Sequence, residues 1–358
     1  MPELRRDPVV GYWTIIASER SRRPIEYRAK EDDVENTNCP FCEGREQQTT
    51  REVFAIRKHD SLPDTPGWSV RTILSKAPLL SHTAPVVDRY GEGMYDLMDG
   101  VGQHEIVIET PTHENDVDDL PLPQVENIIR SYVERFKELE KDERFQYTIL
   151  FKNHGHVSGA PKDIVRHSRS QLISMPITPK RAKEELAMAK SFYDRRERCV
   201  VCDVLRQESM EKSRIVAENS AFFCFCPFAS RSPFEMWILP KRHSADFGHL
   251  DERDFSQLAS ILKSALLRLR VLLDDPPFNF ILHTAPYRHK TKQDSRWAGV
   301  EDYYHWYLQI SPRLTRSAGF EWGTGIHINP TPPEDAASLL RGALEGVDLK
   351  GAGDVAAS

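Results

Sequence analysis

A Cys-x-x-Cys motif occurs twice in this chain, and each copy is followed by two histidines in the same order. The first set is Cys39, Cys42, His113 and His167, and the second set is Cys199, Cys202, His243 and His305. Two thiolates from one turn and two imidazoles can bind zinc as a closed tetrahedral site. A single motif would fit a redox pair equally well, but the repetition predicts two structural zinc ions. The alternative is that one half keeps the residues without the metal.

The segments between these residues also repeat. Each half is expected to contain strands, then a histidine, an amphipathic helix, a further strand and a closing strand that carries the last histidine. In the first half these segments are 52–57, 68–74, 104–109, 125–139, 147–151 and 167–173. In the second half they are 222–226, 235–239, 255–269, 278–282 and 305–310. A charged helix near 180–196 is expected to link the halves. We therefore predict domains at 1–178 and 179–348, with a small, polar and disordered tail at 349–358.

Charge and hydropathy exclude several classes of protein. The 358 residues carry 48 basic and 54 acidic side chains, a net charge of −6. This balance argues against a general nucleic-acid or anionic-membrane binder, although a local basic pocket for a small anion is compatible with it. No apolar run approaches the ~18 residues of a membrane helix, and the first residues have no apolar signal core. We expect a soluble cytoplasmic protein that binds neither nucleic acid nor membrane.

Several longer motifs point to one family. They are the segments at 4–8, 20–24, 39–44, 102–111, 151–155, 226–231, 240–243 and 318–325. With these motifs the sequence resembles the galactose-1-phosphate uridylyltransferase family of the histidine-triad superfamily, over roughly residues 3–345. The resemblance implies an α+β fold of two histidine-triad-like half-barrel domains, each an antiparallel sheet with a packed helix. It also implies a homodimer whose active sites take residues from the partner chain.

The reaction of that family is a double displacement. A histidine attacks the α-phosphorus of UDP-glucose, and the uridylyl group then passes to galactose 1-phosphate. The resemblance places this nucleophile at the third position of His167-Ser168-Arg169-Ser170-Gln171, which here is Arg169. Gln171, which binds phosphate in the family, is retained. A guanidinium stays protonated and has no free lone pair to attack phosphorus, although it can hold a phosphate through two hydrogen bonds.

The resemblance also assigns substrate-binding positions, and some of them depart from the family pattern. The assigned residues are Arg20, Arg23, Ser75, Asn153, Gly159, Ala160, Ser170, Phe320 and Glu321. Pro161 replaces the serine of the phosphate loop, Ser75 replaces an asparagine, and the second half has Tyr307 where His-Trp-His is frequent. Phe320 and Glu321 match a segment that contacts the hexose in the partner subunit.

Three functions are compatible with these departures. The first is a uridylyltransferase-like enzyme acting on nucleotide sugars and hexose 1-phosphates, by direct transfer or with a substitute nucleophile such as His156. The second is a non-catalytic nucleotide-sugar-binding or regulatory protein on the same zinc-stabilised fold. The third is a zinc-stabilised interaction protein with an empty pocket. Turnover of UDP-glucose with galactose 1-phosphate would indicate the first function. Binding without turnover would indicate the second, and the absence of both would indicate the third.

Overall fold

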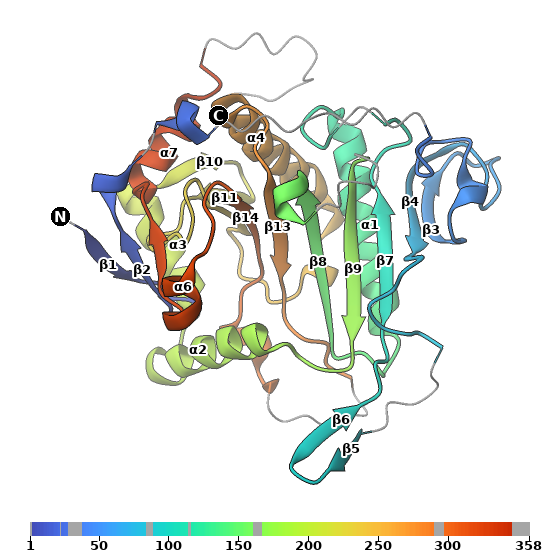
Figure 1. The fold of residues 1–358 in the computed structure, drawn as a ribbon, viewed down its shortest axis with the longest axis horizontal. Helices are drawn as coiled ribbons and strands as arrows, with labels where there is room; N and C mark the ends of the chain where they lie inside the picture. The colour runs from blue at the N-terminus through green and yellow to red at the C-terminus, as the bar shows by residue number, and fades with distance from the viewer. Residues whose placement is uncertain are drawn as a thin grey trace.

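The backbone is organised around one antiparallel sheet of ten strands (Figure 1). The computed structural model describes residues 2–21, 23–27, 38–83, 89–113, 116–159, 167–289 and 297–345. The strand order is β10 (Ile215–Glu218), β11 (Phe222–Phe225), β12 (Met236–Pro240), β14 (Tyr307–Pro312), β13 (Phe278–His283), β8 (Tyr147–His154), β9 (Arg169–Met175), β7 (Gln103–Ile108), β4 (Trp68–Leu74) and β3 (Glu52–Arg57). The predicted tail at 349–358 lies outside the described residues.

Each half of the chain supplies five adjacent strands of this sheet. The first half supplies β3, β4, β7, β9 and β8, and the second half supplies β10, β11, β12, β14 and β13 in the matching order. The halves meet where β8 and β13 pair in antiparallel register, with Asn153 opposite Asn279. The predicted internal repeat and the mixed α+β class are therefore confirmed. Because the sheet is continuous, the domain boundary at 178 and 179 stays a prediction.

Two long helices cover one face of the sheet. They are α1 (Leu122–Glu140) and α4 (Phe255–Leu273), which contact each other behind the strands in Figure 1. Their apolar residues recur at three- and four-residue spacing, so one side of each helix is buried in the main core. Both predicted helices are confirmed, and each extends a few residues beyond its predicted bounds.

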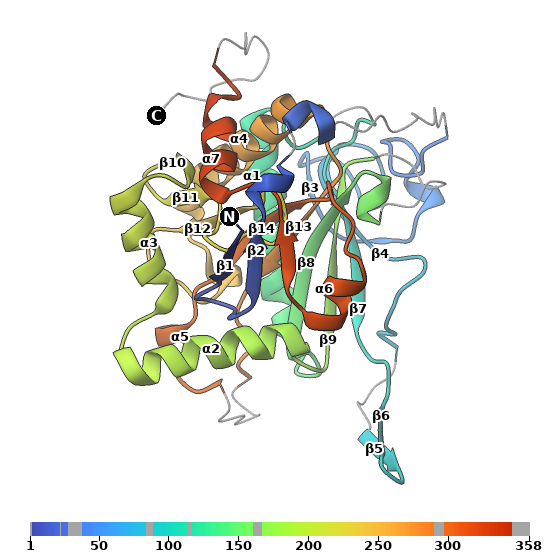
Figure 2. The same ribbon diagram turned by 60° about the vertical axis from the view of Figure 1, so that its left-hand side comes forward.

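The opposite face is covered mainly over the second half. Successive residues of β11 point to opposite faces of the sheet. Phe222 packs in the main core with α4. Phe223 packs in a second core with α2 (Lys180–Arg196) and α3 (Val200–Glu211). A small sheet of β1 (Glu3–Arg6), β2 (Trp13–Ile16) and β15 (His327–Asn329) lies beside α2 and α6 (Gly319–Thr324) in Figure 2. The charged helix predicted at 180–196 is confirmed with the same bounds.

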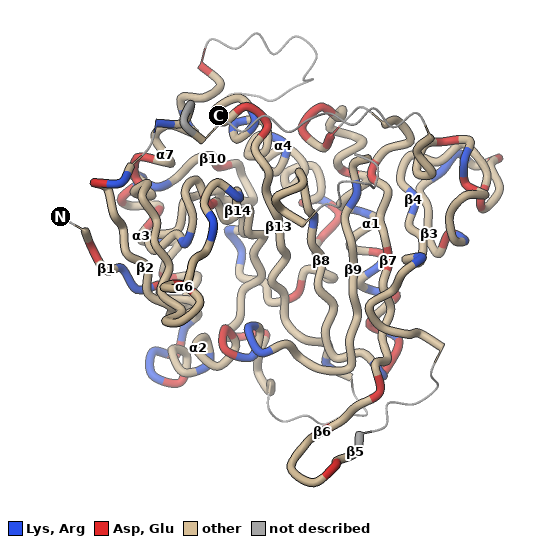
Figure 3. Tube along the Cα trace, in the orientation of Figure 1, with Lys and Arg blue, Asp and Glu red and all other residues tan. Residues whose placement is uncertain are grey.

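The remaining elements are short. They are α5 (Val300–Tyr303), α6 (Gly319–Thr324), α7 (Pro333–Gly342) and the hairpin β5 (Arg89–Glu92) with β6 (Tyr95–Met98). The hairpin projects from the body of the molecule (Figure 2). Basic and acidic positions are interspersed along both halves of the trace (Figure 3). None of the described helices is long and apolar enough to cross a membrane.

Candidate functional site

The first set of cysteines and histidines converges on one point. The ligand atoms of Cys39, Cys42, His113 and His167 all lie within 4.8 Å of one another. The Nδ1 atom of His167 is 3.4 Å from Sγ of Cys39 and 3.8 Å from Sγ of Cys42. Tetrahedral zinc, with Zn–S near 2.3 Å and Zn–N near 2.0–2.1 Å, requires sulfur–nitrogen separations of about 3.6 Å. The four donors therefore fit a tetrahedral metal ion.

The second set has the same geometry. Its four ligand atoms also lie within 4.8 Å of one another, and Sγ of Cys202 is 3.3 Å from Nδ1 of His243 and 3.6 Å from Nδ1 of His305. Cys199 is the residue before α3, and Cys202 lies in the first turn of that helix. The two histidine rings meet nearly edge to face in both sets, at interplanar angles of 71° and 81°. The predicted repeat of Cys2His2 groups is thus present in the structure.

Backbone carbonyls orient three of the four histidines. Nε2 of His167 lies 2.7 Å from the carbonyl oxygen of Thr110, and Nε2 of His305 lies 3.0 Å from that of Pro240. His243 contacts the carbonyl of Glu301 in the same way, at 2.7 Å. A carbonyl only accepts, so Nε2 carries the proton and the lone pair of Nδ1 faces the sulfur atoms. Burial lowers the pKa of His167 to about 4, which favours the neutral form needed by a metal ligand.

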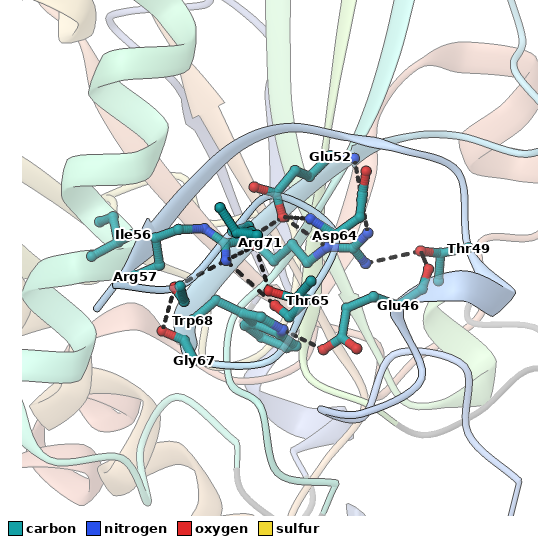
Figure 4. A network of polar contacts seen from close by, with 12 residues as sticks. Glu46, Thr49, Glu52, Ile56, Arg57, Asp64, Thr65, Gly67, Trp68 and Arg71 are labelled. Atoms are coloured by element: carbon teal, nitrogen blue, oxygen red, sulfur yellow. Dashed lines mark hydrogen bonds and ion pairs between the residues drawn. The ribbon is translucent and has the colours of Figure 1, made fainter. Parts of the chain in front are cut away.

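A polar network fixes the loop that follows Cys42 (Figure 4). The indole nitrogen of Trp68 donates to Glu46 at 2.8 Å, and the same carboxylate accepts from the amide of Gly44 at 3.0 Å. Arg71, which is fully buried on β4, donates to Asp64 at 2.6 Å and to Thr49 at 2.8 Å. Strand β4 therefore holds the segment that carries the first metal ligands.

The side chains after His167 alternate between the two faces of β9. Ser170 is completely buried and its hydroxyl is 2.7 Å from that of Tyr132 on α1. Arg169 and Gln171, with odd numbers, point away from α1. The resemblance assigned Ser170, Arg169 and Gln171 to one site, but the hydroxyl of Ser170 lies on the other side of the sheet from the latter two.

Arg169 lies beside the first metal group. Its Nη1 donates to the carbonyl of His167 at 3.2 Å, and its guanidinium carbon is 5.5 Å from the ring centroid of Phe41, within the Cys-x-x-Cys loop. This is the range of a cation–π contact. Burial lowers the pKa of Arg169, whereas the charges of Cys39 and Glu109 act in the opposite direction. The guanidinium of Arg169 therefore lies between the ring of Phe41 and the backbone of β9.

Gln171 is oriented by His104, a residue that sequence analysis did not identify as functional. Nε2 of His104 is 2.9 Å from Oε1 of Gln171, and its Nδ1 accepts from the amide of Leu79 at 3.4 Å. Nε2 must then donate the proton, so the NH2 group of Gln171 faces away from His104. Ser75, also predicted, donates its backbone amide to the carbonyl of His104 at 2.8 Å. Strands β4, β7 and β9 thus bring Ser75, His104 and Gln171 together.

Asn153 and Gly159 lie close together at the end of β8. Gly159 has φ of +100°, which favours glycine, and a Cβ atom there would lie 3.4 Å from Nδ2 of Asn153. His156 lies in the intervening turn and is exposed. Ala160 and Pro161 lie outside the described residues. The described part of the predicted phosphate loop is therefore built around the amide of Asn153.

Other predicted residues lie on the surface. Arg20 and Arg23 are both exposed near the N-terminus. Phe320 and Glu321 lie in α6, where Phe320 is 44% exposed and Trp322 is 81% exposed. Among the described residues, no hydrogen bond or ion pair joins α6 to β9. One chain thus brings together the central residues of the predicted site. Arg20, Arg23, Phe320 and Glu321 are not among them.

A buried charge network lies beneath β9. The Nζ atom of Lys152 is 2.6 Å from Glu109, 3.1 Å from Asp116 and 2.8 Å from the hydroxyl of Ser168. The hydroxyl oxygen of Ser168 also lies 2.6 Å from Glu109 and 2.8 Å from Asp116, and its single proton is donated to one carboxylate at a time. Although burial opposes it, the charges of Asp116 and Glu109 raise the pKa of Lys152. Because Ser168 lies between His167 and Arg169, this network holds both neighbours in place.

The corresponding surface of the second half is closed. Tyr307 takes the place of Arg169 relative to the metal ligand His305, and its ring stacks on Trp237 and on His283, each at 4.3 Å between centroids. Tyr307 is completely buried beneath α2, and Arg181 of that helix donates to Gln309 at 3.1 Å. His283 is a buried core histidine. Only the first-half copy of the motif therefore leaves its polar side chains on an open face, within the described residues.

The fold and the site thus define a protein built from a duplicated strand–helix unit, with one Cys2His2 group in each copy. Residues 185–345 match the galactose-1-phosphate uridyl transferase C-terminal domain, and residues 91–177 match the N-terminal domain of a domain of unknown function, DUF4931. The ADP-glucose phosphorylase of Arabidopsis thaliana is 35% identical over 344 residues, covering 95% of this chain and 92% of that protein. The chain belongs to the galactose-1-phosphate uridylyltransferase family, within the histidine-triad superfamily.

Two further relatives span the whole fold. The galactose-1-phosphate uridylyltransferase of Thermotoga maritima is 26% identical over 348 residues, covering 95% of this chain and 98% of that protein. The crystal structure of an Arabidopsis thaliana ADP-glucose phosphorylase with bound ADP-glucose has a TM-score of 0.78 and 33% identity, covering 98% of this chain and 99% of that one. The chain is thus similar to proteins named for two different nucleotide-sugar reactions.

Proposed function

We propose that the chain binds a nucleotide sugar on the open face of its first half, and that it does so without forming a covalent nucleotidyl-histidine. The observation that carries this proposal is Arg169, two residues after His167, at the position where the resemblance places the family's nucleophile. A guanidinium remains charged and lacks a free lone pair, even where burial lowers its pKa. It can bind two phosphate oxygens at once.

The neighbouring groups support an anionic ligand. His104 turns the NH2 group of Gln171 outward, and Asn153 carries a second amide at the end of β8. Both groups are hydrogen-bond donors, as is Arg169. Amide and guanidinium donors suit the oxygens of a diphosphate. The relatives named for ADP-glucose and for galactose 1-phosphate make ADP-glucose and UDP-glucose the first ligands to test.

A second candidate function is direct transfer between a nucleotide sugar and a hexose 1-phosphate. The retained donors Gln171 and Asn153 favour it, because they would stabilise charge on a phosphate in any transfer mechanism. In this route a phosphate oxygen of hexose 1-phosphate attacks the α-phosphorus of UDP-glucose. The bond from that phosphorus to the bridging oxygen breaks, and glucose 1-phosphate leaves. No protein atom becomes covalently bound.

Both Cys2His2 groups are proposed to hold zinc. Thiolate and neutral imidazole are the donors that zinc prefers, and the separations and oriented Nδ1 atoms support this assignment. When bound, the ion supplies a structural cross-link, since four protein ligands leave no open position for a substrate.

The assembly is proposed to be a homodimer in which α6 serves the partner's site. The exposure of Phe320 and Trp322 on the same short helix supports this, because neighbouring exposed apolar side chains mark interaction sites. In such a dimer Phe320 and Glu321 would contact the hexose.

Incubation with UDP-glucose or ADP-glucose is expected to leave the intact mass of the protein unchanged. Because Arg169 cannot form a phosphoramidate as histidine does, no acid-labile nucleotidyl adduct should accumulate. Intact-protein mass spectrometry at short times checks this. An adduct that maps to His156 would replace the proposal with a covalent route through the loop after β8. Arg169→His should not restore full turnover by itself, since Ser75 and Pro161 still differ from the family pattern.

Arg169→Ala is expected to weaken the binding of ADP-glucose or UDP-glucose by about tenfold to a hundredfold. Hydrogen bonds to charged groups contribute about 1.5–3 kcal/mol, and about 1.4 kcal/mol corresponds to one decade of affinity. Isothermal titration calorimetry measures the change. Arg195→Ala, at an exposed arginine on α2, removes the same charge elsewhere and should bind like the wild type. Equal affinities for the wild type and Arg169→Ala would show that Arg169 does not contact the diphosphate.

A further inference from the structure

We propose that Asn279, on the central strand of the second half, orients the side-chain amide of Asn153 so that its NH2 group faces the phosphate site. Asn279 is then a positioning residue for a site built mainly by the first half. The inference rests on the nucleotide-sugar site proposed above. It starts from the register of the central strand pair, which places Asn279 directly opposite Asn153.

The orientation of the Asn279 amide follows from its two outer partners. Nε of Arg313 donates to Oδ1 of Asn279, and an arginine has only donors, so the atom facing it must be the oxygen. The other end of the amide lies 2.9 Å from the carbonyl oxygen of Ser158, which only accepts. Both partners thus require the same assignment. The usual ambiguity between the oxygen and nitrogen of an asparagine is removed here by chemistry.

This orientation is passed on to Asn153. Nδ2 of Asn279 is 2.7 Å from the side-chain amide of Asn153, and a donor must face an acceptor, so Asn153 turns its Oδ1 toward Asn279. Asn279 is buried, which keeps water from replacing this contact. Nδ2 of Asn153 then points away from Asn279 and lies beside Gly159. A Cβ atom added at Gly159 would lie 3.4 Å from this nitrogen.

The result is a donor that is directed by residues of the other half. Within the described residues, Nδ2 of Asn153 donates to no protein acceptor, so both of its protons remain for a ligand. A phosphate oxygen is the matching acceptor. If the amide were turned over, Asn153 would present its oxygen, which repels a phosphate. Arg313 and Asn279 therefore determine whether Asn153 attracts or repels the ligand.

Asn279→Asp tests this orientation, because aspartate has the same shape but no N–H group. Its carboxylate still accepts from Arg313, so Asn153 must turn its NH2 group toward Asp and its oxygen toward the ligand. We expect about tenfold or greater loss of affinity for ADP-glucose in calorimetry. Asn279→Ala lets Asn153 turn freely and should lose about two- to fivefold. A purely structural role predicts the reverse order, since alanine leaves the larger gap.

Two controls separate orientation from other effects. Asn219→Asp removes an amide donor to the carbonyl of Gln257, 2.8 Å away in a second-half turn, and should bind ADP-glucose like the wild type. Repeating the titrations at higher salt screens long-range repulsion by the new carboxylate, whereas a turned amide in contact with the ligand keeps its effect. If Asn279→Asp does not fold, Arg313→Met removes the anchoring donor at an exposed side chain, with Arg316→Met as the charge-matched control.

The outcomes distinguish this inference from the proposed function. If wild type binds ADP-glucose and the aspartate variant binds as well as wild type, or better than the alanine variant, the inference is wrong and the function stands. If wild type binds neither ADP-glucose nor UDP-glucose, inorganic pyrophosphate is the probe. The same order of variants with pyrophosphate supports the inference without the proposed function. Absence of binding to all three probes overturns both.

Discussion

Cys199→Ser is expected to remove one of two zinc ions from each chain and to lower the melting temperature by about 10 °C or more. Structural zinc contributes directly to folding, with apparent binding free energies of about 10–16 kcal/mol in zinc-finger peptides. Cys199 directly precedes α3, so loss of this ligand frees the start of a helix from the core that it shares with α2. Elemental analysis of protein purified without added metal, together with calorimetric melting, measures both effects.

Cys224→Ser is the matched control for that experiment. Cys224 is also buried, but it lies on β11 and belongs to neither metal group. Its replacement buries a hydroxyl, at a cost of about 1–3 kcal/mol, and should leave two zinc ions per chain. A wild-type content of one or none would show that at least one half keeps its ligand residues without the metal.

Lys152→Met is expected to lower the free energy of unfolding by about 3–5 kcal/mol. The variant keeps the length of the side chain but removes the ammonium group from Glu109, whereas Asp116 keeps His154 at 2.8 Å. Glu109 is completely buried, so water cannot compensate for the missing charge. Urea unfolding measures the loss. Since Ser168 bonds to the same carboxylates, we also expect weaker ADP-glucose binding from misplacement of Arg169.

The comparison for Lys152 is an ion pair on the surface. Lys190 on α2 bonds to Asp194 at 2.7 Å, and both side chains are about half exposed. Lys190→Met should change stability by about 0–1 kcal/mol, as exposed pairs usually do. Similar losses of unfolding free energy in the two variants would mean that the charge network beneath β9 is hydrated and stabilises the fold no more than a surface ion pair does.

Local patterns in the sequence predicted local structure well. The strands at 52–57 and 68–74 and the helix at 180–196 have the predicted bounds, because alternation and three- to four-residue spacing are properties of each segment alone. The sheet of β1, β2 and β15 was not predicted. It pairs segments from opposite ends of the chain, and no local pattern records such a partner.

The residues of the candidate site also divide into those that local sequence patterns predicted and those that tertiary contacts determine. The two Cys2His2 groups could be predicted because motif spacing and repetition identify their eight residues. His104 and Asn279 were missed, since their roles come from contacts across neighbouring strands. The position of Ser170 on the helix side could have been predicted from strand alternation, because Arg169 and Gln171 occupy the other side. Helix α2 covers the corresponding surface of the second half. This is a tertiary feature that the repeated motif does not predict.

The pairing of β8 with β13 has a consequence for the ancestry of the fold. Each is the edge strand of its own five-stranded unit, and each satisfies the other's backbone N–H and C=O groups. A single unit would expose that edge, which is a template for joining another copy. The intact chain is therefore a covalently tethered form of what a lone unit could achieve only by self-association. Tethering also permits divergence, since one unit can keep an open face while the other is filled.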